Sequence, residues 1–531
     1  MTPRQLAGQP AAPGLALGRI VEWPSVKGGE AAAGEVVCTL PEAVETAAVQ
    51  LQRLREAAGG AEARAILEFQ VEFLRDPALL EPALPLLEAG SDVATAWCVA
   101  IDAQIDDFAA ADDDYFRHRV GDLLDMRARV LAILAGRHGD PGAQALPPDA
   151  IVVADDITPS RFISTDWGAH QAVLLRGGSP TAHVALLARS RALPMVVAIG
   201  DARLAPGSTV IVDGAAGTIV VEPDPQAIAD YRQRLAEADR DRDEAARAAR
   251  LPAHTRLGER VQVLVNVSGV GDLQSVDPAI CDGIGLVRTE LMFADGPPDE
   301  ATQLDAYRLL LQWAGDRPVV VRTLDAGGDK PVPGWSIPHE SHPFLGVRGV
   351  RLSLRHAAGF KVQLRALLRA AACGNLRVMV PMVTQAAEME AVRALLAACL
   401  DELRAEGVPQ RRPALGVMIE VPAAALALDA LGPVDFASIG SNDLLQYTMA
   451  AARDNPLVSP LADAAHPGFT RLLGLIVQAA KAADVPLSLC GDLAAQPAQV
   501  PGLLQAGLRS LSMPAAAVGE VKRAIAGWPG E

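Results

Sequence analysis

Cysteine is scarce in this chain of 531 residues, and its six copies are scattered without a Cys-x-x-Cys pair. This spacing argues against a disulfide framework or a zinc cluster, so we expect a protein of the reducing cytoplasm. Aromatic residues make up only 4% of the chain, too few for the stacking platforms that hold single-stranded nucleic acid. The sequence also lacks an apolar run of about 18 residues for a membrane span. It lacks the apolar stretch of about 7–15 residues that marks an export signal.

Positive charge is in the minority, because 47 Lys and Arg residues face 64 Asp and Glu residues and the net charge is −17. This balance argues against a general binder of nucleic acid or of anionic membranes, although it allows a local basic pocket. Half of the residues are hydrophobic, which is enough for packed cores. At about 150 residues per domain, the length suggests three or four domains.

The pattern of apolar residues changes several times along the chain. Short Val/Ile-rich runs predict an α/β domain made of residues 1–35 and 141–225, and helical spacing predicts a helical insertion over residues 36–140. A highly charged helical stretch over 226–252 is typical of a linker. Eight strand-like runs alternate with helical segments over 253–531, which is the rhythm of a (β/α)8 barrel. We therefore expect a multidomain α/β protein.

Polar residues follow the apolar runs of the expected barrel, where such barrels place their active sites. They include Arg288, Arg322, Glu420, the pair Asn442 and Asp443, and Cys490. Surface loops are polar in any case, but they usually offer Gly, Ser or Asp rather than arginine and glutamate directly at the strand ends. The sequence therefore predicts a site at the carboxyl ends of the strands.

The charged residues of this set suit a small phosphorylated anion. The guanidinium groups of Arg288, Arg322 and Arg453 can each grip phosphate or carboxylate oxygens. The carboxylates of Glu420 and Asp443, together with substrate oxygens and waters, are the usual way to hold Mg²⁺. Any one arginine alone is more simply explained by a salt bridge, and the argument depends on the whole set.

Cys490 has three possible roles at this stage. Most cysteines are small buried hydrophobic residues. A thiol beside a cationic phosphate site can also be a nucleophile or a proton donor. The sequence alone does not choose between these roles.

His183 lies in the segment GGSPTAHVALLARS, after a glycine turn and at the predicted start of a helix. The unpaired N–H groups of a helix N-terminus favour an anionic group, and Thr181 can cap this helix or donate a hydroxyl hydrogen bond. A neutral imidazole is a nucleophile that can accept a phosphoryl group. A lone histidine is more often structural, so His183 is of interest because a phosphate site is predicted elsewhere. Direct transfer between the two places would require reorientation about the 223–252 connector.

Motifs along nearly the whole chain resemble those of the phosphoenolpyruvate–protein phosphotransferases, enzyme I of the bacterial sugar phosphotransferase system. The matching segments are PAAPGLALGRI, ILEFQVEFLRDPALL, GGSPTAHVALLARSRALPMVV, GIGLVRTELMF, VVVRTLDAGGDKPVP, PFLGVRGVRL, VMIEVPAAAL, SIGSNDLLQYTMAAARDN and LSLCGDLA. Ala182 departs from the pattern, since the family commonly has serine there, and His342 stands where asparagine is frequent.

The resemblance implies a swivelling phosphohistidine domain, a helical subdomain that docks the phosphocarrier protein HPr or a homologue, and a phosphoenolpyruvate barrel that forms a homodimer. It implies that His183 accepts the phosphoryl group on Nε2 and that Cys490 protonates the enolate to give pyruvate. It also implies a substrate-binding set and a Mg²⁺-binding set, which are Arg288, Arg322, Asn442, Asp443 and Arg453 for the substrate and Glu420 and Asp443 for the metal. No role for nucleic acid or membrane insertion is expected.

Two other interpretations stay open. Pyruvate phosphate dikinase and phosphoenolpyruvate synthase share the histidine and barrel domains but use ATP. They need a further nucleotide domain of about 200–300 residues, for which we find neither room nor a G-x-x-x-x-G-K-[ST] loop. A non-catalytic paralogue that only binds phosphoenolpyruvate or a partner is the second alternative.

Overall fold

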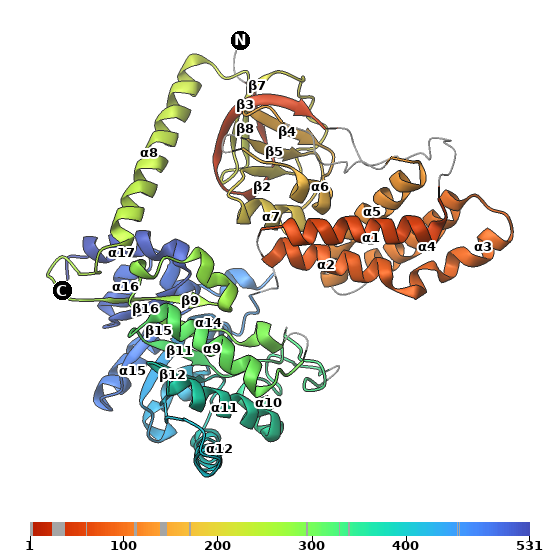
Figure 1. Cartoon of the computed structure of the whole chain (residues 1–531). Coiled ribbons are helices and arrows are strands. Elements are labelled where there is room, and N and C mark those ends of the chain that lie inside the picture. Colours follow the sequence, from red (N-terminus) through yellow and green to blue (C-terminus); the bar gives the residue numbers. More distant parts are fainter. Residues whose placement is uncertain are drawn as a thin grey trace. The chain divides into compact units, whose positions relative to one another are not determined.

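A computed structural model of the chain forms two compact units, residues 1–238 and 239–531 (Figure 1). The described residues are 4–23, 38–59, 61–110, 114–137, 146–168, 171–293, 296–328, 330–337, 340–453, 455 and 457–530. The domain boundaries expected near residues 35 and 140 lie outside these ranges. Among the described residues, no helix has both the length and the apolar character needed to cross a membrane.

The first unit is built on one eight-stranded sheet in the order β1-β8-β7-β3-β4-β5-β6-β2. Its strands are β1 (Arg4–Ala7), β2 (Gln9–Ala12), β3 (Leu15–Glu22), β4 (Ala150–Ala154), β5 (Ala172–Leu175), β6 (Met195–Val197), β7 (Thr209–Asp213) and β8 (Thr218–Val221). Strands β3 to β6 pair in parallel, and antiparallel strands flank them on both sides. Helices α6 (Pro159–Ser164) and α7 (His183–Ser190) belong to the parallel part. Strands β1 and β2, and helix α6, were not predicted from the sequence.

The expected helical insertion is present between β3 and β4. It consists of α1 (Leu40–Ala57), α2 (Ala61–Arg75), η1 (Pro77–Ala83), α3 (Leu84–Glu88), α4 (Val93–Ala110) and α5 (Asp114–Leu134). Its buried side chains, such as Leu51, Trp97 and Met126, share one continuous core with Val152 and Val173 of the sheet. The insertion therefore packs as part of the first unit, because apolar faces on helices and sheet are buried against each other.

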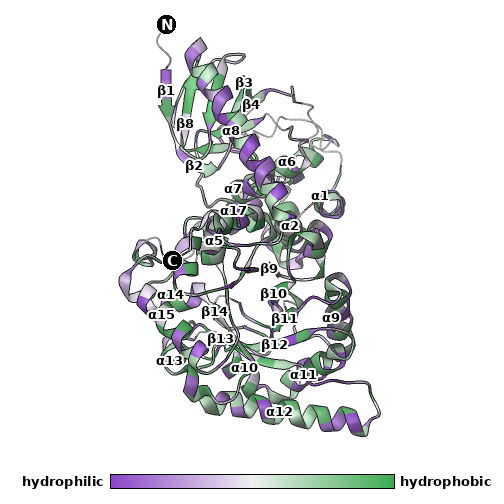
Figure 2. Cartoon of the chain, turned by 90° about the vertical axis from the view of Figure 1, so that its left-hand side faces the viewer, coloured by the Kyte–Doolittle hydropathy of each residue, from purple (hydrophilic) through white to green (hydrophobic). Residues whose placement is uncertain are grey.

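The predicted linker is a single helix, α8 (Pro225–Ala249). Most of its residues are exposed, and Figure 2 shows its strongly hydrophilic surface. The boundary between the two compact units falls inside this helix, between Ala238 and Asp239.

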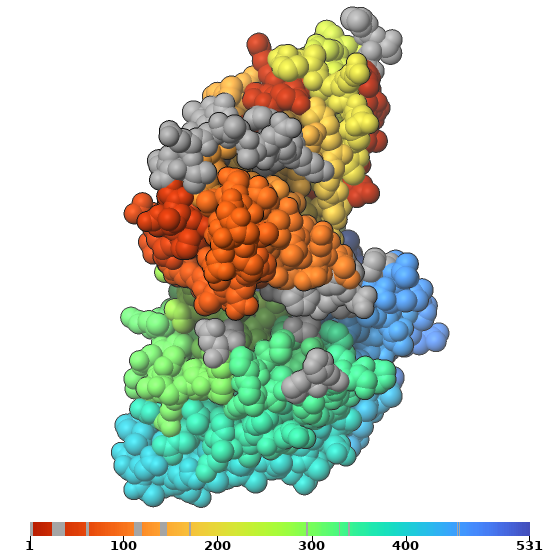
Figure 3. All heavy atoms as spheres, turned by 90° about the vertical axis from the view of Figure 1, so that its right-hand side faces the viewer, coloured from red at the N-terminus to blue at the C-terminus, as the bar shows by residue number. Residues whose placement is uncertain are grey.

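The second unit contains a closed barrel of eight parallel strands, as the sequence predicted. The strands are β9 (Gln262–Val267), β10 (Ile284–Val287), β11 (Val319–Arg322), β12 (Leu376–Val380), β13 (Ala414–Ile419), β14 (Phe436–Gly440), β15 (Leu487–Cys490) and β16 (Ser510–Met513). The α-helices around them are α9 (Glu300–Ala314), α10 (Val350–Arg355), α11 (Ala357–Ala371), α12 (Ala386–Ala405), α13 (Pro422–Leu426), α14 (Ser441–Met449), α15 (Pro467–Ala482), α16 (Val500–Gln505) and α17 (Val518–Gly527). Figure 3 shows part of the outer surface of this ring, green to cyan for residues 300–405.

Neighbouring residues of several barrel strands enter two different cores. On β11, Val319 and Val321 join the large core between strands and helices, whereas Val320 joins a small core inside the barrel. The same alternation separates Val417 from Met418 on β13. Because successive side chains of a strand point to opposite faces, the residue that follows each inward-facing residue by two positions also points inward. This two-residue alternation therefore determines which residues at the strand ends point into the barrel mouth.

We expect Lys522→Met to destabilise the second unit by about 2–4 kcal/mol. Lys522 on α17 is buried, and its ammonium group donates to the carbonyl oxygens of Ala249, Leu251 and Ile280 at 2.7, 2.8 and 2.8 Å. A methionine would fill the space but leave three carbonyl groups without their charged donor. Urea unfolding measures the loss, with Lys481→Met on the exposed side of α15 as the control. Equal stability of the two variants would contradict this anchoring role.

Candidate active site

The predicted site residues of the barrel line one cavity of about 340 Å³ at the carboxyl ends of the strands. The seven that lie together there are Arg288, Arg322, Glu420, Asn442, Asp443, Arg453 and Cys490. Lys330, in the motif VVVRTLDAGGDKPVP, lines the same cavity. His183 belongs to the first unit and is a separate feature.

The alternation of the strands explains why these residues face the cavity. Val320 and Met418 point into the barrel, so Arg322 and Glu420, two positions further on, point the same way at the mouth. Cys490 itself belongs to the inner core. Gly440 makes room for the carboxylate, because a β-carbon at this position would lie 2.8 Å from Oε2 of Glu420.

Arg322 is held between carboxylates in the barrel mouth. Its Nη2 donates to Oε1 of Glu290 at 2.6 Å, and its Nη1 lies 3.1 Å from Oδ2 of Asp325. Burial alone would lower the pKa of the Arg322 guanidinium, but the negative charges of Glu290, Asp325 and Glu420 raise it above its ordinary value. Arg322 is therefore a permanent, immobilised cation. The Glu290 atom Oε2 is buried with no hydrogen-bond partner in the described structure.

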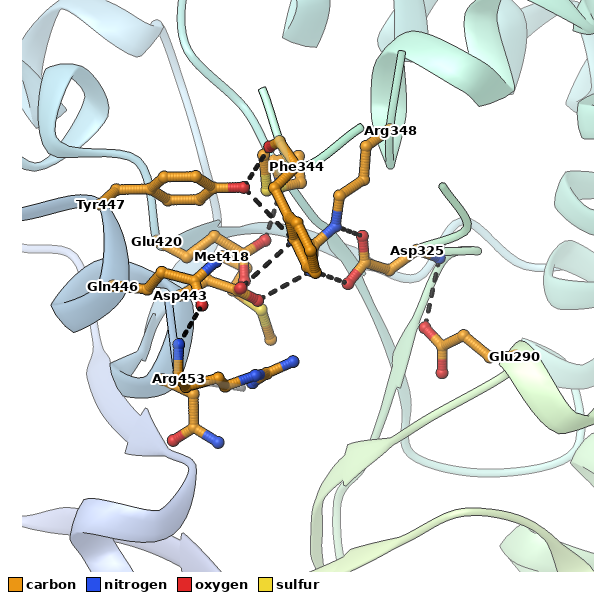
Figure 4. A network of polar contacts seen from close by, with 12 residues as sticks. Glu290, Asp325, Phe344, Arg348, Met418, Glu420, Asp443, Gln446, Tyr447 and Arg453 are labelled. Atoms are coloured by element: carbon orange, nitrogen blue, oxygen red, sulfur yellow. Dashed lines mark hydrogen bonds and ion pairs between the residues drawn. The ribbon is translucent and has the colours of Figure 1, made fainter. Parts of the chain in front are cut away.

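Arg348 contacts the carboxylates of this site, and the sequence analysis gave it no role. It is 1% exposed, and its guanidinium forms two-point contacts with both Asp325 and Asp443 (Figure 4). Its Nη2 lies 3.0 Å from Oδ2 of Asp325 and 2.9 Å from Oδ2 of Asp443. Arg348 lies in a loop before α10 rather than at a strand end, so the strand-end rule did not find it. The motif PFLGVRGVRL contained the only signal.

Glu420 is a buried carboxyl group close to other carboxylates, and the nearby arginines offset their negative charge only in part. It is 1% exposed, and its Oε1 accepts the backbone N–H of Met382 at 2.7 Å. Burial and the charges of Asp325 and Asp443 raise the pKa of Glu420 to about 8, against the opposing effect of Arg322 and Arg348. A divalent cation would relieve this repulsion, and carboxylate oxygens are its preferred ligands.

The side chains of this site nevertheless offer few ligands for a metal ion. Among the described residues, no group of three or more His, Cys, Asp or Glu side chains is arranged to hold an ion. Both oxygens of Asp443 also accept from Arg348. Glu420 and Asp443 thus fit Mg²⁺ as a two-carboxylate site that is completed by substrate oxygens and water.

Asn442 and Arg453 form the side of the cavity next to α14. The Asn442 side chain pairs with Asp492: its Nδ2 donates to Oδ2 at 2.9 Å, and its Oδ1 accepts the Asp492 backbone N–H at 2.9 Å. Arg453 follows the end of α14, where its backbone N–H donates to Oε1 of Gln446 at 3.2 Å. Its side chain is exposed, so this cation borders solvent while Arg322 and Arg348 lie inside.

Cys490 is a buried thiol that lines the cavity. Its Sγ accepts from the hydroxyl of Ser438 at 3.6 Å and donates to the carbonyl oxygen of Ile439 at 3.5 Å. Burial raises the pKa of the Cys490 thiol above its ordinary value, against the smaller effect of the Ser438 hydrogen bond. A thiol that keeps its proton is a poor nucleophile and a competent acid. This geometry favours the proton-donor role over the nucleophile role.

In the first unit, His183 is the first residue of α7, with Ala182 as its N-cap. Thr181 was expected either to cap this helix or to donate a hydroxyl hydrogen bond, and its hydroxyl oxygen lies 2.9 Å from that of Ser179. The ring atom Nδ1 of His183 lies 3.2 Å from Oδ2 of Asp122 on α5. The sequence gave no signal for this contact, since the two residues are 61 positions apart.

Three family models match successive parts of the chain. They are described as PEP-utilising enzyme, N-terminal, over residues 7–119, as its mobile domain over 146–217, and as its PEP-binding domain over 242–528. The last of these alone covers more than half of the chain. The expected (β/α)8 barrel and its place after the α/β domain are confirmed.

Several named proteins are similar to this chain over most of its length. The chain is 38% identical to the phosphoenolpyruvate-protein phosphotransferase of Haloferax volcanii, over 88% of this chain and 82% of the relative. It is 36% identical to the protein of the same name from Mycoplasma genitalium, over 88% and 81%. A multiphosphoryl transfer protein of Rhodobacter capsulatus is 36% identical over 90% of this chain, which spans 58% of that longer protein.

A solution structure of enzyme I covers 44% of this chain and 99% of its own, at 24% identity and a TM-score of 0.36, and this low score adds no argument. The sequence matches carry the assignment by themselves, because they extend over nearly the full chain and over four fifths of two relatives. This chain belongs to the family of phosphoenolpyruvate-protein phosphotransferases.

Proposed function

We propose that this enzyme transfers the phosphoryl group of phosphoenolpyruvate first to its own His183 and then to a histidine of the phosphocarrier protein HPr or a homologue, and releases pyruvate. The observation that carries this proposal is the convergence of cationic, carboxylate and thiol groups in one cavity of about 340 Å³. Phosphoenolpyruvate needs cations for its phosphate and carboxylate, and its enolate needs a proton. The cavity offers groups for each.

Arg288, Arg322 and Arg453 bind the substrate anion in this proposal. Arg322 is suited to the transferring phosphoryl group, because its carboxylate partners hold the guanidinium in place. The guanidinium therefore needs no reorganisation when negative charge develops during transfer. Arg453 borders solvent and suits an entering anion. Asn442 and the backbone around Asp443 supply polar contacts at the N-terminus of α14, where unpaired N–H groups favour an anion.

Glu420 and Asp443 would hold Mg²⁺, which supplies Lewis-acid neutralisation of phosphoryl oxygens when it is bound. The enolate left by transfer takes a proton at carbon from the Cys490 thiol, and the thiolate regains a proton from water. Transfer also needs Nε2 of His183 within about 3 Å of phosphorus, in line with the leaving oxygen. Because His183 and the cavity belong to different units, we propose reorientation about the connector that contains α8.

The partners are proposals as well. Helices α1 to α5 dock the carrier protein, and the partly exposed Leu186 and Leu124, near His183 and Asp122 in sequence, offer apolar area for it. Homodimerisation through the barrel is supported by exposed leucines such as Leu345 and Leu457, which are 69% and 87% exposed. We also propose a cytoplasmic location.

Incubation with ³²P-labelled phosphoenolpyruvate and Mg²⁺ tests the reaction directly. We expect acid-labile label on the wild-type chain, no label on His183→Ala, and loss of label when a carrier protein is added. His254→Ala, at an exposed histidine of the second unit, is the matched control and should label normally. An unlabelled wild type that still binds phosphoenolpyruvate would favour a non-catalytic regulator. ATP-dependent label would point to the dikinase type of enzyme.

Arg322→Lys should lower kcat/KM for phosphoenolpyruvate by about 10² or more, because a single ammonium cannot replace a planar fork aimed at developing charge. Steady-state kinetics measure the loss. Arg308→Lys on the outer surface of α9 is the control that should retain activity. A normal rate for the Arg322 variant would remove this residue from the reaction.

Cys490→Ala should label at His183 but make pyruvate slowly, because the enolate loses its acid. In the wild type, the raised pKa of the thiol means that the proton donor is present below that pKa and is lost only as pH rises through it. The protonation step should therefore persist to a pH above the ordinary pKa of a free thiol, which is about 8.5. Quenched-flow measurement of label and pyruvate separates the steps, with Cys373→Ala at an exposed thiol as control. Equal slowing of both steps would contradict the acid role.

A further inference from the structure

The imidazole of His183 faces a buried carboxylate of the helical insertion. Its Nδ1 lies 3.2 Å from Oδ2 and 3.3 Å from Oδ1 of Asp122, and the two side chains are 16% and 0% exposed. The contact joins α7 to α5, across the join between the sheet and the inserted helices. An ionised carboxylate can only accept a hydrogen bond, so the ring must present N–H at Nδ1. The other ring nitrogen, Nε2, then carries the lone pair.

Asp122 is fixed by other contacts on its own helix. Nη1 of Arg119 lies 3.0 Å from Oδ2 of Asp122, and the Arg119 guanidinium stacks over the Phe69 ring of α2 at 4.3 Å from its centroid. Asp122 thus contacts the imidazole directly, and Arg119 contacts the same Asp122 carboxylate. The paired arginine offsets the negative charge of this buried carboxylate.

We infer that Asp122 is a positioning residue that holds the proton on Nδ1 of His183 both before and after phosphorylation. This inference rests on the proposed role of His183 as phosphoryl acceptor. Asp122 selects the tautomer whose Nε2 is nucleophilic, as the buried aspartate does for the histidine of serine proteases. It also orients the ring, because the bond joins two elements of one packed core.

The proton on Nδ1 matters most after transfer. When the Nε2 lone pair forms the P–N bond, the P–O bond of the enol phosphate breaks and its electron pair leaves with the enolate. The ring keeps its Nδ1 proton and becomes a cation, which Asp122 stabilises. In onward transfer the P–N bond breaks and its electrons return to Nε2, so the leaving group is neutral imidazole rather than imidazolate. A carboxylate that retains this proton keeps the phosphoryl group easy to pass on.

Histidine ¹⁵N NMR of the full-length protein tests the tautomer without any substrate. The resonance of His183, identified by its loss in His183→Ala, should show Nδ1–H in the wild type and a shift toward Nε2–H in Asp122→Ala. The matched control is Asp125→Asn, one turn along α5, where the buried carboxylate accepts from the backbone N–H and hydroxyl of Ser160 at 2.8 and 2.7 Å. An unchanged His183 spectrum in a folded Asp122→Ala protein would overturn the inference.

A second measurement follows the phosphorylated ring. Phosphoryl transfer to an added carrier should fall above a certain pH. In Asp122→Asn this pH should be lower by about one unit or more, because an amide does not favour the ring cation as a carboxylate does. Asp125→Asn should keep the wild-type profile even if its thermal stability drops. Coincident profiles for wild type and Asp122→Asn would overturn the role after transfer. Absence of label on wild-type His183 would instead refute the proposed function and leave the tautomer result standing.

Discussion

Two guanidinium groups buried among carboxylates are the interaction on which the barrel mouth depends. Arg322 and Arg348 share Asp325, and each reaches one further carboxylate, Glu290 for the first and Asp443 for the second. Breaking such a buried pair leaves an uncompensated charge, at a cost of about 3–5 kcal/mol. The network therefore fixes the positions of the groups that face the cavity before any anion arrives. The free-energy cost of arranging these groups for phosphoryl transfer is therefore met when the protein folds and not during the reaction.

The first unit uses the same device on a smaller scale. Helix α5 presents two buried carboxylates toward the sheet domain, Asp122 to the imidazole of His183 and Asp125 to the start of α6 at Ser160. An isolated buried carboxylate would be unstable, and each has a cation or several donors beside it. The helical insertion thus sets the surroundings of the candidate phosphoryl acceptor.

Sequence reasoning reached the barrel because its signal is local. Each strand is a short Val/Ile-rich run, and the strand-end rule placed Arg322, Glu420 and Cys490 at the mouth. The rule does not identify Arg348, because this residue lies in a loop. It does not identify Asp122 either, because this residue contacts His183 only through the packing of the helical insertion on the sheet. The alternation of Val320 with its neighbours was not legible in the sequence, because Val319 and Val321 are also valines and a strand buried on both faces is apolar throughout.

The burial of Cys490 has a consequence for the chemistry of the thiol outside turnover. Peroxides and alkylating agents react with thiolates, and a thiol that stays protonated and has little exposed surface reacts slowly with them. Cys373 lies exposed on the barrel exterior and is the sulfur that such reagents meet first. The fold thereby places a sulfur atom in the wall of the candidate site, while burial slows its oxidation to sulfinic and sulfonic acids.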